Sequence, residues 1–317
     1  MNNNNLYAVA FYNLENLFDI INDPHVLDDD FTSEGRLEWT EERYEDKIDK
    51  LGKAISKIAR VDGANPPSLV GVAEVENKKV LNDLIASPAL KKYHYRYVHF
   101  NSPDERGIDT ALLYRENQFE VLNAQPISLL VYNEGNVRDY TRDILYVHGR
   151  LKAEEIHLFV NHWPSRRQGT EDMAYKRIKA AQVLQQYISE IKNNEADAKF
   201  VIMGDFNDDP NSESIKQHLV TKDFYNPMSK LLDPNNRGSL THKLAWNLFD
   251  QIIISTNFFN SSSNQLTFQK ADILDAHFLE EWNKKYEGFP FRTYVGKKYL
   301  GGYSDHFPVY LIFKHNH

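Results

Sequence analysis

The chain has 317 residues, of which 41% are hydrophobic and 26% charged, and this composition excludes a disordered protein. The net charge of −8 argues against a generally basic nucleic-acid-binding surface, although a local basic patch beside an acidic metal site would still bind phosphate. The absence of cysteine excludes disulfides, thiolate metal sites and cysteine nucleophiles.

The chain also lacks the marks of a membrane protein. No apolar run approaches the roughly 20 residues that a membrane helix needs, and the first residues lack the basic and apolar regions of a secretory signal. We therefore expect a soluble monomer with no stable membrane association, formed by one domain over residues 1–317. The compartment stays open, since a signal removed before Met1 would leave no trace.

The first two predicted strands each end in polar residues. An apolar strand at 6–12 is followed by Asn13, and a second at 68–73 is followed by Glu74 and Glu76, which alternation would put on one side. A turn or cap is the alternative role for Asn13. Apolar residues at steps of three and four, with capping residues before them, predict helices at 44–58 and 78–85.

The next segments favour a mixed sheet or a sandwich. Several predicted strands follow one another without an intervening helix, which does not fit a simple doubly wound parallel sheet. Asp109 lies near the start of the second of them. These strands are expected at 93–100, 107–115, 119–122, 127–132 and 144–152.

A strand at 156–160 leads into a loop that carries His162, Arg166 and Arg167. Guanidinium groups match phosphate oxygens, so this loop is a candidate phosphate-binding segment. Trp163 would either contact a base or sugar or, as we favour, pack against the strand end. The spacing then predicts a helix over 174–191.

The apolar run from Phe200 ends at Gly204, which is followed by Asp205 and Asn207. On extended chain these two side chains point the same way and suit a hard divalent cation or a phosphate held by one; the alternative is a solvated turn. Asp250 lies inside an apolar strand at 248–254, where a carboxylate needs a partner.

The last part of the chain contains an expected helix around 277–286 and a terminal strand at 307–313. Asp305 and His306 precede this strand and follow two glycines. Carboxylate and amide oxygens suit Mg²⁺ or Mn²⁺ better than zinc. Histidines distant in sequence suit acid and base chemistry near neutral pH. These residues predict metal-assisted attack of water on a phosphoester.

Six motifs resemble, in order, those of the endonuclease/exonuclease/phosphatase superfamily, and together they span residues 13 to 309. They are FYNLENLF with Asn13, GVAEVEN with Glu74, VNHWPSR with His162, GDFND at 204–208, FDQIIIS with Asp250, and SDHFPV at 304–309. The resemblance implies an α/β fold of four layers, in which two mixed sheets pack face to face with helices outside.

The resemblance also implies roles for individual residues. Glu74 would be the main Mg²⁺ ligand (Mn²⁺ being an alternative), with Asn13 and Asp305 close to the metal. Asp250 would pair with His306, and the division of base and acid between His306 and Asp205 stays open. The remaining implied roles are phosphate and nucleophile positioning by Asp205 and Asn207, donation to a phosphate oxygen by His162, and orientation of His162 by Asp109.

We expect a metal-dependent phosphodiesterase, most simply an endonuclease acting on nucleic acid, with Arg166 and Arg167 contacting substrate phosphate. The alternative is a phosphatase or phospholipase-type hydrolase of inositol phosphates, sphingomyelin or another small phosphoester. A phosphate-binding module without activity is a third candidate, against which the intact set of acids and histidines speaks.

Overall fold

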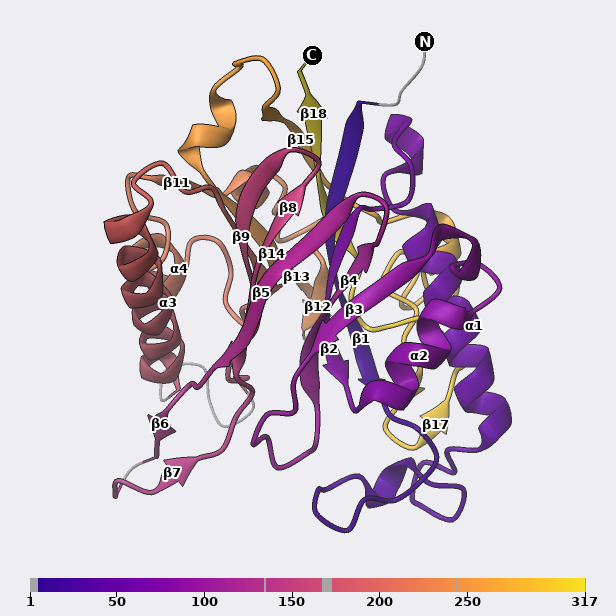
Figure 1. Cartoon of the computed structure of the whole chain (residues 1–317). Helices are drawn as coiled ribbons and strands as arrows, with labels where there is room; N and C mark the ends of the chain where they lie inside the picture. Colours follow the sequence, from indigo (N-terminus) through magenta and orange to yellow (C-terminus); the bar gives the residue numbers. More distant parts are fainter. Residues whose placement is uncertain (1–4, 134, 167–172, 243, 317) are drawn as a thin grey trace.

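Two six-stranded mixed sheets pack face to face in the computed structural model, and helices cover both outer faces (Figure 1). The structure describes residues 5–133, 135–166, 173–242 and 244–316. The predicted four-layer architecture is confirmed.

The first sheet has the strand order β15-β18-β1-β2-β4-β3. Its centre is a parallel pair, β1 and β2, and its other neighbours are antiparallel. The strands are β1 (Leu6–Leu17), β2 (Leu69–Val75), β3 (Tyr95–His99), β4 (Asp109–Arg115), β15 (Leu266–Ile273) and β18 (Val309–His315).

The second sheet has the order β11-β14-β10-β9-β8-β5 and also contains one parallel pair, β9 and β10. Its strands are β5 (Phe119–Ile127), β8 (Ile144–Leu151), β9 (Glu154–His162), β10 (Phe200–Asp205), β11 (Phe224–Tyr225) and β14 (Asp250–Ser255). Short ribbons pair β6 (Val131–Tyr132) with β7 (Arg138–Asp139), β12 (Leu240–His242) with β13 (Ala245–Asn247), and β16 (Tyr294–Val295) with β17 (Lys298–Tyr299).

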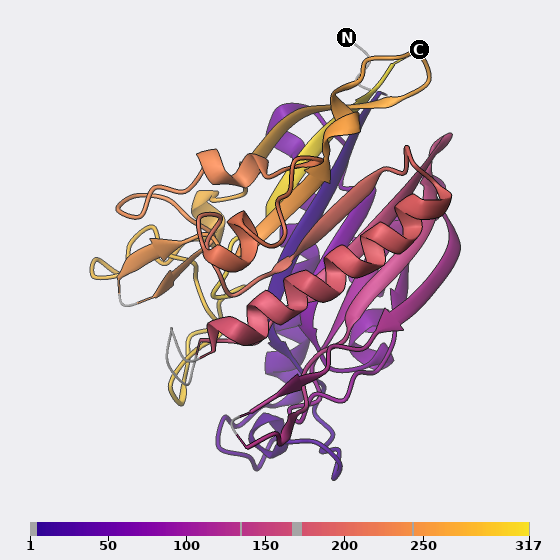
Figure 2. The ribbon, with the colours of Figure 1, turned by 90° about the vertical axis from the view of Figure 1, so that its left-hand side faces the viewer.

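Helices α1 (Glu41–Lys57) and α2 (Lys78–Ala86) cover the first sheet, while α3 (Ala174–Asn194) and α4 (Glu213–Lys216) lie on the side of the second, where α3 runs along the sheet (Figure 2). The predicted caps form: Thr40 Oγ1 accepts from the Arg43 amide at 3.4 Å, and the Asn77 side chain accepts from the amides of Lys79 and Val80. These caps fix where the two helices begin.

The two sheets approach closely where small residues face large ones. A Cβ added to Gly71 in β2 would lie 2.5 Å from Sδ of Met203 in β10. One apolar cluster joins both inner faces and includes Val70 and Val72 from the first sheet and Val201 and Ile252 from the second. The relative position of the sheets, and of every side chain at their edges, is therefore fixed by packing.

The prediction of a helix around 277–286 is wrong. Within this stretch the helical structure is limited to a 3₁₀ turn at His277–Leu279. The side chain of Glu281 accepts hydrogen bonds from the amides of Trp282 and Asn283, and these bonds compete with the backbone hydrogen bonds of a helix. Other 3₁₀ turns occupy Asp29–Phe31, Arg60–Asp62, Lys91–Tyr93, Pro227–Lys230 and Thr256–Phe259.

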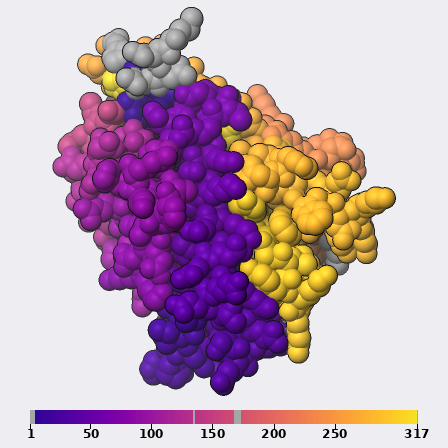
Figure 3. Space-filling model, turned by 90° about the vertical axis from the view of Figure 1, so that its right-hand side faces the viewer, coloured from indigo at the N-terminus to yellow at the C-terminus, as the bar shows by residue number. Residues whose placement is uncertain are grey.

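The C-terminal residues lie against the N-terminal part of the chain, as Figure 3 shows in yellow beside indigo. Lys50 of α1 donates to the carbonyl of Gly301 at 2.6 Å, and the Tyr299 hydroxyl donates to Asp46 at 3.0 Å. These contacts help hold the segment that leads to His306. Among the described helices, none combines the length and apolar character that crossing a membrane requires.

Candidate active site

Residues in the C-terminal parts of four strands, two from each sheet, come together. Because β1 runs parallel to β2 and β9 runs parallel to β10, each pair delivers its C-terminal residues together. Asn13 and Glu74 come from the first sheet, and His162 and Asp205 from the second. Asp250 begins the antiparallel strand β14 directly opposite Asp205.

Asn13 connects the two sheets. It is buried, and its Nδ2 donates to Oε1 of Glu74 at 3.3 Å and to Oδ2 of Asp205 at 3.0 Å. Glu74 has a φ of 62°, at a shift in the pairing of β2 with its neighbours, and its other oxygen accepts from the Asn16 amide at 2.9 Å. This bulge turns Glu74 toward the site, whereas Glu76 accepts from the Asp19 amide at 2.6 Å.

Asp250 and His306 form a buried pair. Nδ1 of His306 lies 2.6 Å from Oδ2 of Asp250, and the Ser239 hydroxyl donates to the same oxygen at 2.5 Å. Burial by itself lowers the pKa of His306, but the charge and hydrogen bond of Asp250 raise that pKa well above its usual range. Nε2 of His306 then faces Asp205 at 4.0 Å and Asp305 at 3.8 Å.

His162 lies opposite His306 across Asp205. Its Nε2 is 3.8 Å from Oε1 of Glu74 and 3.9 Å from Oδ2 of Asp205. Burial, with the neighbouring charge of Asp250, raises the pKa of Asp205 to about 7. Two imidazoles thus flank a carboxylate that changes charge near neutral pH.

The donor set fits a hard divalent cation. Glu74 and Asp305 offer carboxylate oxygens that are partly exposed, and Oδ1 of the fully buried Asp250 has no hydrogen-bond partner among the described residues. Oxygen atoms of Asp205 and Asp250 and a ring nitrogen of His306 lie within 4.8 Å of one another. So many carboxylates at one edge repel each other, and a bound cation would relieve that repulsion.

A sequence model of the Endonuclease/Exonuclease/phosphatase family matches residues 8–315, which include all of these side chains. The chain belongs to this family. Its members hydrolyse phosphoester bonds and generally use a divalent metal. A search of curated proteins found no match.

Several solved structures share the fold over nearly the whole chain. The catalytic domain of human nocturnin with bound sulfate matches at 18% identity and a TM-score of 0.60, covering 98% of this chain and 93% of that one. A mannosyl-6-phosphatase of Bacteroides thetaiotaomicron matches at 16% and 0.60 over 97% and 99%. D. rerio TDP2 complexed with a single-strand DNA product matches at 14% and 0.57 over 98% and 99%.

Two residues that the family resemblance placed in the site have other contacts. Asp109 accepts from the Ser102 hydroxyl at 2.5 Å and lies 3.0 Å from Nε2 of His99, and the orientation of His162 by Asp109 stays a prediction. Asn207 has a φ of 50° instead of an extended conformation, and its Nδ2 donates to the carbonyl of Trp163 at 2.9 Å. Asn207 thus joins the loops after β9 and β10.

Arg166, one of the two arginines expected to contact substrate phosphate, forms hydrogen bonds within the protein. Nε of Arg166 donates to the Asn207 carbonyl and Nη2 donates to Asp208, each at 2.7 Å. These contacts favour a structural role for Arg166. Arg167 lies outside the described residues. Trp163 is fully buried and its ring donates to Asn161, which agrees with the packing role favoured above.

Three residues that support the site, Ser239, Arg142 and Lys47, were not identified from the sequence. Ser239 lies in a weakly patterned stretch, where no sequence signal marks it. Arg142 donates to the carbonyls of His162 and Trp163 at 3.2 and 2.7 Å. Lys47 is buried, donates to Thr293, and has a pKa that burial lowers. Its position on the apolar face of α1 was a usable signal, since a lysine there needs a partner.

Proposed function

We propose that the chain hydrolyses phosphoester bonds with a divalent cation held by Glu74, Asp305 and the Asn13 amide. The observation that carries this proposal is the buried Asp250–His306 pair, in which the second ring nitrogen of His306, Nε2, faces the carboxylates of Asp205 and Asp305. A bound Mg²⁺ would neutralise phosphate charge and orient the ester.

The pKa directions support a division of labour between the two central groups. Asp250 keeps His306 protonated at neutral pH, so His306 suits donation to a phosphate oxygen or to the leaving group. Asp205, whose pKa burial raises to about 7, suits removal of a proton from the attacking water. His162, 3.9 Å from Asp205, suits a contact with a second phosphate oxygen.

The described residues give more support to a small phosphoester than to a nucleic-acid strand. A strand is held by several cations that pair with successive phosphates. The arginines described near the site instead form ion pairs within the protein, Arg142 with Asp104 at 2.9 Å and both Arg166 and Arg177 with Asp208 at 2.7 Å. The substrate we propose is therefore a small phosphoester.

A nuclease is the second candidate, because the same fold in TDP2 holds a single-strand DNA product. The deciding experiment compares wild type with Glu74→Ala on p-nitrophenyl phosphate, bis-p-nitrophenyl phosphate, supercoiled plasmid and RNA, each with Mg²⁺ or Mn²⁺ and then with EDTA. We expect hydrolysis of a small ester that requires metal and is lost in Glu74→Ala.

Cleavage of plasmid or RNA at a higher rate than the small esters would replace the first candidate by the nuclease. No metal-dependent hydrolysis of any of the four substrates, with both proteins folded by circular dichroism, would contradict the proposed function itself.

A further inference from the structure

A second group of metal-ligating side chains lies on the second sheet, away from the candidate active site. His148 of β8 and His157 of β9 are directly opposite each other in the antiparallel pair. His162 lies five positions after His157 along β9, which corresponds to about 17 Å at roughly 3.3 Å per residue. A ligand at this group would not touch the phosphoester site.

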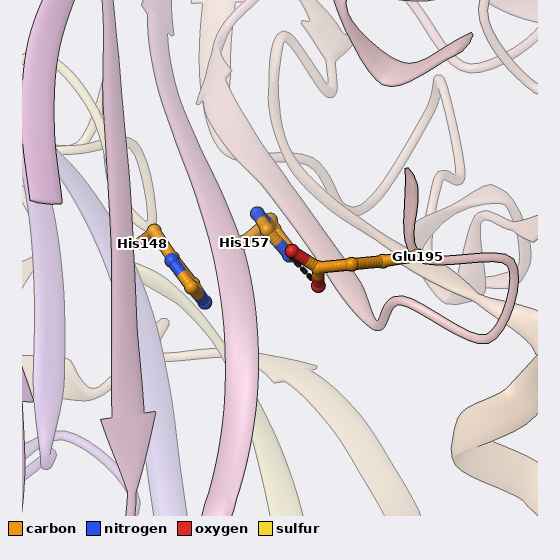
Figure 4. A group of neighbouring side chains, drawn as sticks. All are labelled: His148, His157 and Glu195. Atoms are coloured by element: carbon orange, nitrogen blue, oxygen red, sulfur yellow. Dashed lines mark hydrogen bonds and ion pairs between the residues drawn. The ribbon is translucent and has the colours of Figure 1, made fainter. Parts of the chain in front are cut away.

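The two imidazoles are stacked, with ring centroids 4.3 Å apart and an interplanar angle of 4°. Glu195, the residue after α3, lies next to His157, and its Oε2 is 3.1 Å from Nε2 of His157 (Figure 4). One donor atom each from His148, His157 and Glu195 lie within 4.8 Å of one another. Three separate elements thus bring their donors to one point.

A fourth donor is beside this point. Oε2 of Glu155 lies 3.2 Å from Nε2 of His148, while Arg150 holds the other oxygen of Glu155 at 2.7 Å. Nε2 of His148 is buried, yet its contact with Glu155 does not have the geometry of a hydrogen bond. The nitrogen therefore lies near a carboxylate without a hydrogen bond that satisfies it.

The surroundings of His157 suit a metal ligand. Its ring is buried, and the hydroxyl of Tyr146 lies 2.8 Å from Nδ1. Metal-bound histidines commonly donate their other ring N–H to an oxygen in this way, which orients the ring. Burial lowers the pKa of His157, so the neutral form that binds metals is favoured.

We propose that His148, His157 and Glu195, with Glu155 as an additional ligand, bind one Zn²⁺ ion or a similar transition-metal ion. Two imidazoles and one or two carboxylates form a donor set that suits such ions. Donors of a tetrahedral zinc site lie about 3.3 Å apart, as bond lengths of roughly 2.0–2.1 Å require. Small side-chain rotations of the partly exposed His148 and Glu195 would bring their atoms to that spacing.

The bound ion would fasten the C-terminal end of α3 to the strands β8 and β9. The alternative is a hydrogen-bonded cluster in which Glu195 accepts a hydrogen bond from Nε2 of His157 and no metal binds. The two cases differ in one measurable quantity, the number of zinc equivalents that the folded protein retains.

The test is equilibrium dialysis of the full chain against Zn²⁺ in the presence of excess Mg²⁺, comparing wild type with His148→Gln and Glu195→Gln. His277→Gln is the matched control, because His277 also pairs with a glutamate, Glu280, at 3.2 Å but belongs to no such group among the described residues. Subtracting the zinc equivalents retained by each variant from those retained by wild type cancels any zinc bound at the candidate active site.

We expect wild type and His277→Gln to retain one more equivalent of zinc than His148→Gln and Glu195→Gln. Zinc should also raise the Tm of the first pair by more than that of the second. Equal retention by wild type and His148→Gln would overturn the proposal. If His148→Gln does not fold, equal retention by wild type and Glu195→Gln, which changes a half-exposed side chain, would overturn it instead.

Discussion

Asp250 has no exposed surface, and it accepts hydrogen bonds from Ser239 and from the ring of His306. An asparagine at this position keeps the shape but removes the charge that holds His306 protonated and correctly oriented. We expect Asp250→Asn to lower kcat by roughly 10²–10⁴-fold with a much smaller change in KM. Steady-state kinetics on the best small ester of the panel measures this.

The control for this substitution is Asp233→Asn, which changes a partly exposed aspartate whose side-chain hydrogen bonds are within its own turn. It should leave both kinetic constants near those of wild type. A kcat for Asp250→Asn that matches the control would mean that the Asp250–His306 pair is not part of the chemistry.

Single residues differ in how far the sequence predicts their surroundings. An aspartate inside the apolar run of β14 demands a partner, and that cost is visible in sequence. Ser239, which completes the pair, comes from a stretch with no periodicity. Its role depends on the close approach of residues 239 and 250, which no local pattern encodes.

At the level of elements, the loop after β10 is fastened by Arg166, which contacts the Asn207 carbonyl and Asp208. We expect Arg166→Met to lower the free energy of unfolding by about 1–3 kcal/mol, because a partly buried charged hydrogen bond is lost. KM should change little. Urea unfolding and steady-state kinetics on the same preparation measure both effects.

Arg36→Met is the matched control, since Arg36 pairs with Asp30 at 2.5 Å on the surface. An exposed pair of this kind contributes only about 0.2–1 kcal/mol. If Arg166→Met instead raises KM strongly and leaves the free energy of unfolding unchanged, this result would support the sequence-based prediction that Arg166 contacts substrate phosphate.

Asp209 joins the same loop to the start of β14, accepting from the Leu248 amide at 2.8 Å. Burial raises its pKa, so the folded state binds the proton more tightly than the unfolded state. This contribution to stability is full below the unfolded pKa and is lost as pH rises through the folded pKa. We therefore expect the free energy of unfolding of Asp209→Asn to increase relative to that of wild type when urea unfolding is measured at successively higher pH, from acid to neutral.

Asp223→Asn should behave in the opposite way, because the hydrogen bond from Lys192 lowers the pKa of Asp223. The stability that Asp223 contributes is full above its unfolded pKa and is lost as pH falls through its folded pKa. A pH-independent difference between Asp209→Asn and wild type would show that burial of Asp209 does not affect its titration.

Most elements could be predicted from periodicity and caps, as α1 and α2 illustrate. The failure at 277–286 has a local physical cause, since Glu281 satisfies backbone amides that a helix would use otherwise. The orientation of Glu74 against Glu76 also escaped prediction, because alternation holds only in a strand without a bulge.

For the whole molecule, the proposed metal ligands should couple ion binding to unfolding. A ligand at 100 times its Kd stabilises the folded state by about 2.7 kcal/mol, which corresponds to a few degrees in Tm for a chain of this size. We expect Mg²⁺ to raise the Tm of wild type and to have no such effect on Glu74→Ala. Differential scanning calorimetry with Mg²⁺ or EDTA measures this.

Glu116→Ala, which removes an exposed carboxylate paired with Arg96, is the control and should respond to Mg²⁺ as wild type does. If Mg²⁺ raises the Tm of Glu74→Ala as much as that of wild type, the stabilising ion binds at another site.

The four-layer architecture could be predicted because ordered motifs along almost the whole chain resemble one family. The pairing of the arginines could not, since Arg166 and its partner Asp208 are 42 residues apart and meet only after β9 and β10 have aligned. The substrate class depends on such pairings more than on composition.

Asn13 bonds both to Glu74 of its own sheet and to Asp205 of the other. A partly folded chain with only one sheet in place would hold only half of the donors, so it should bind no cation. Hydrolytic activity would then appear late in refolding, together with the docking of the two sheets. The catalytic centre would serve as a reporter of complete assembly.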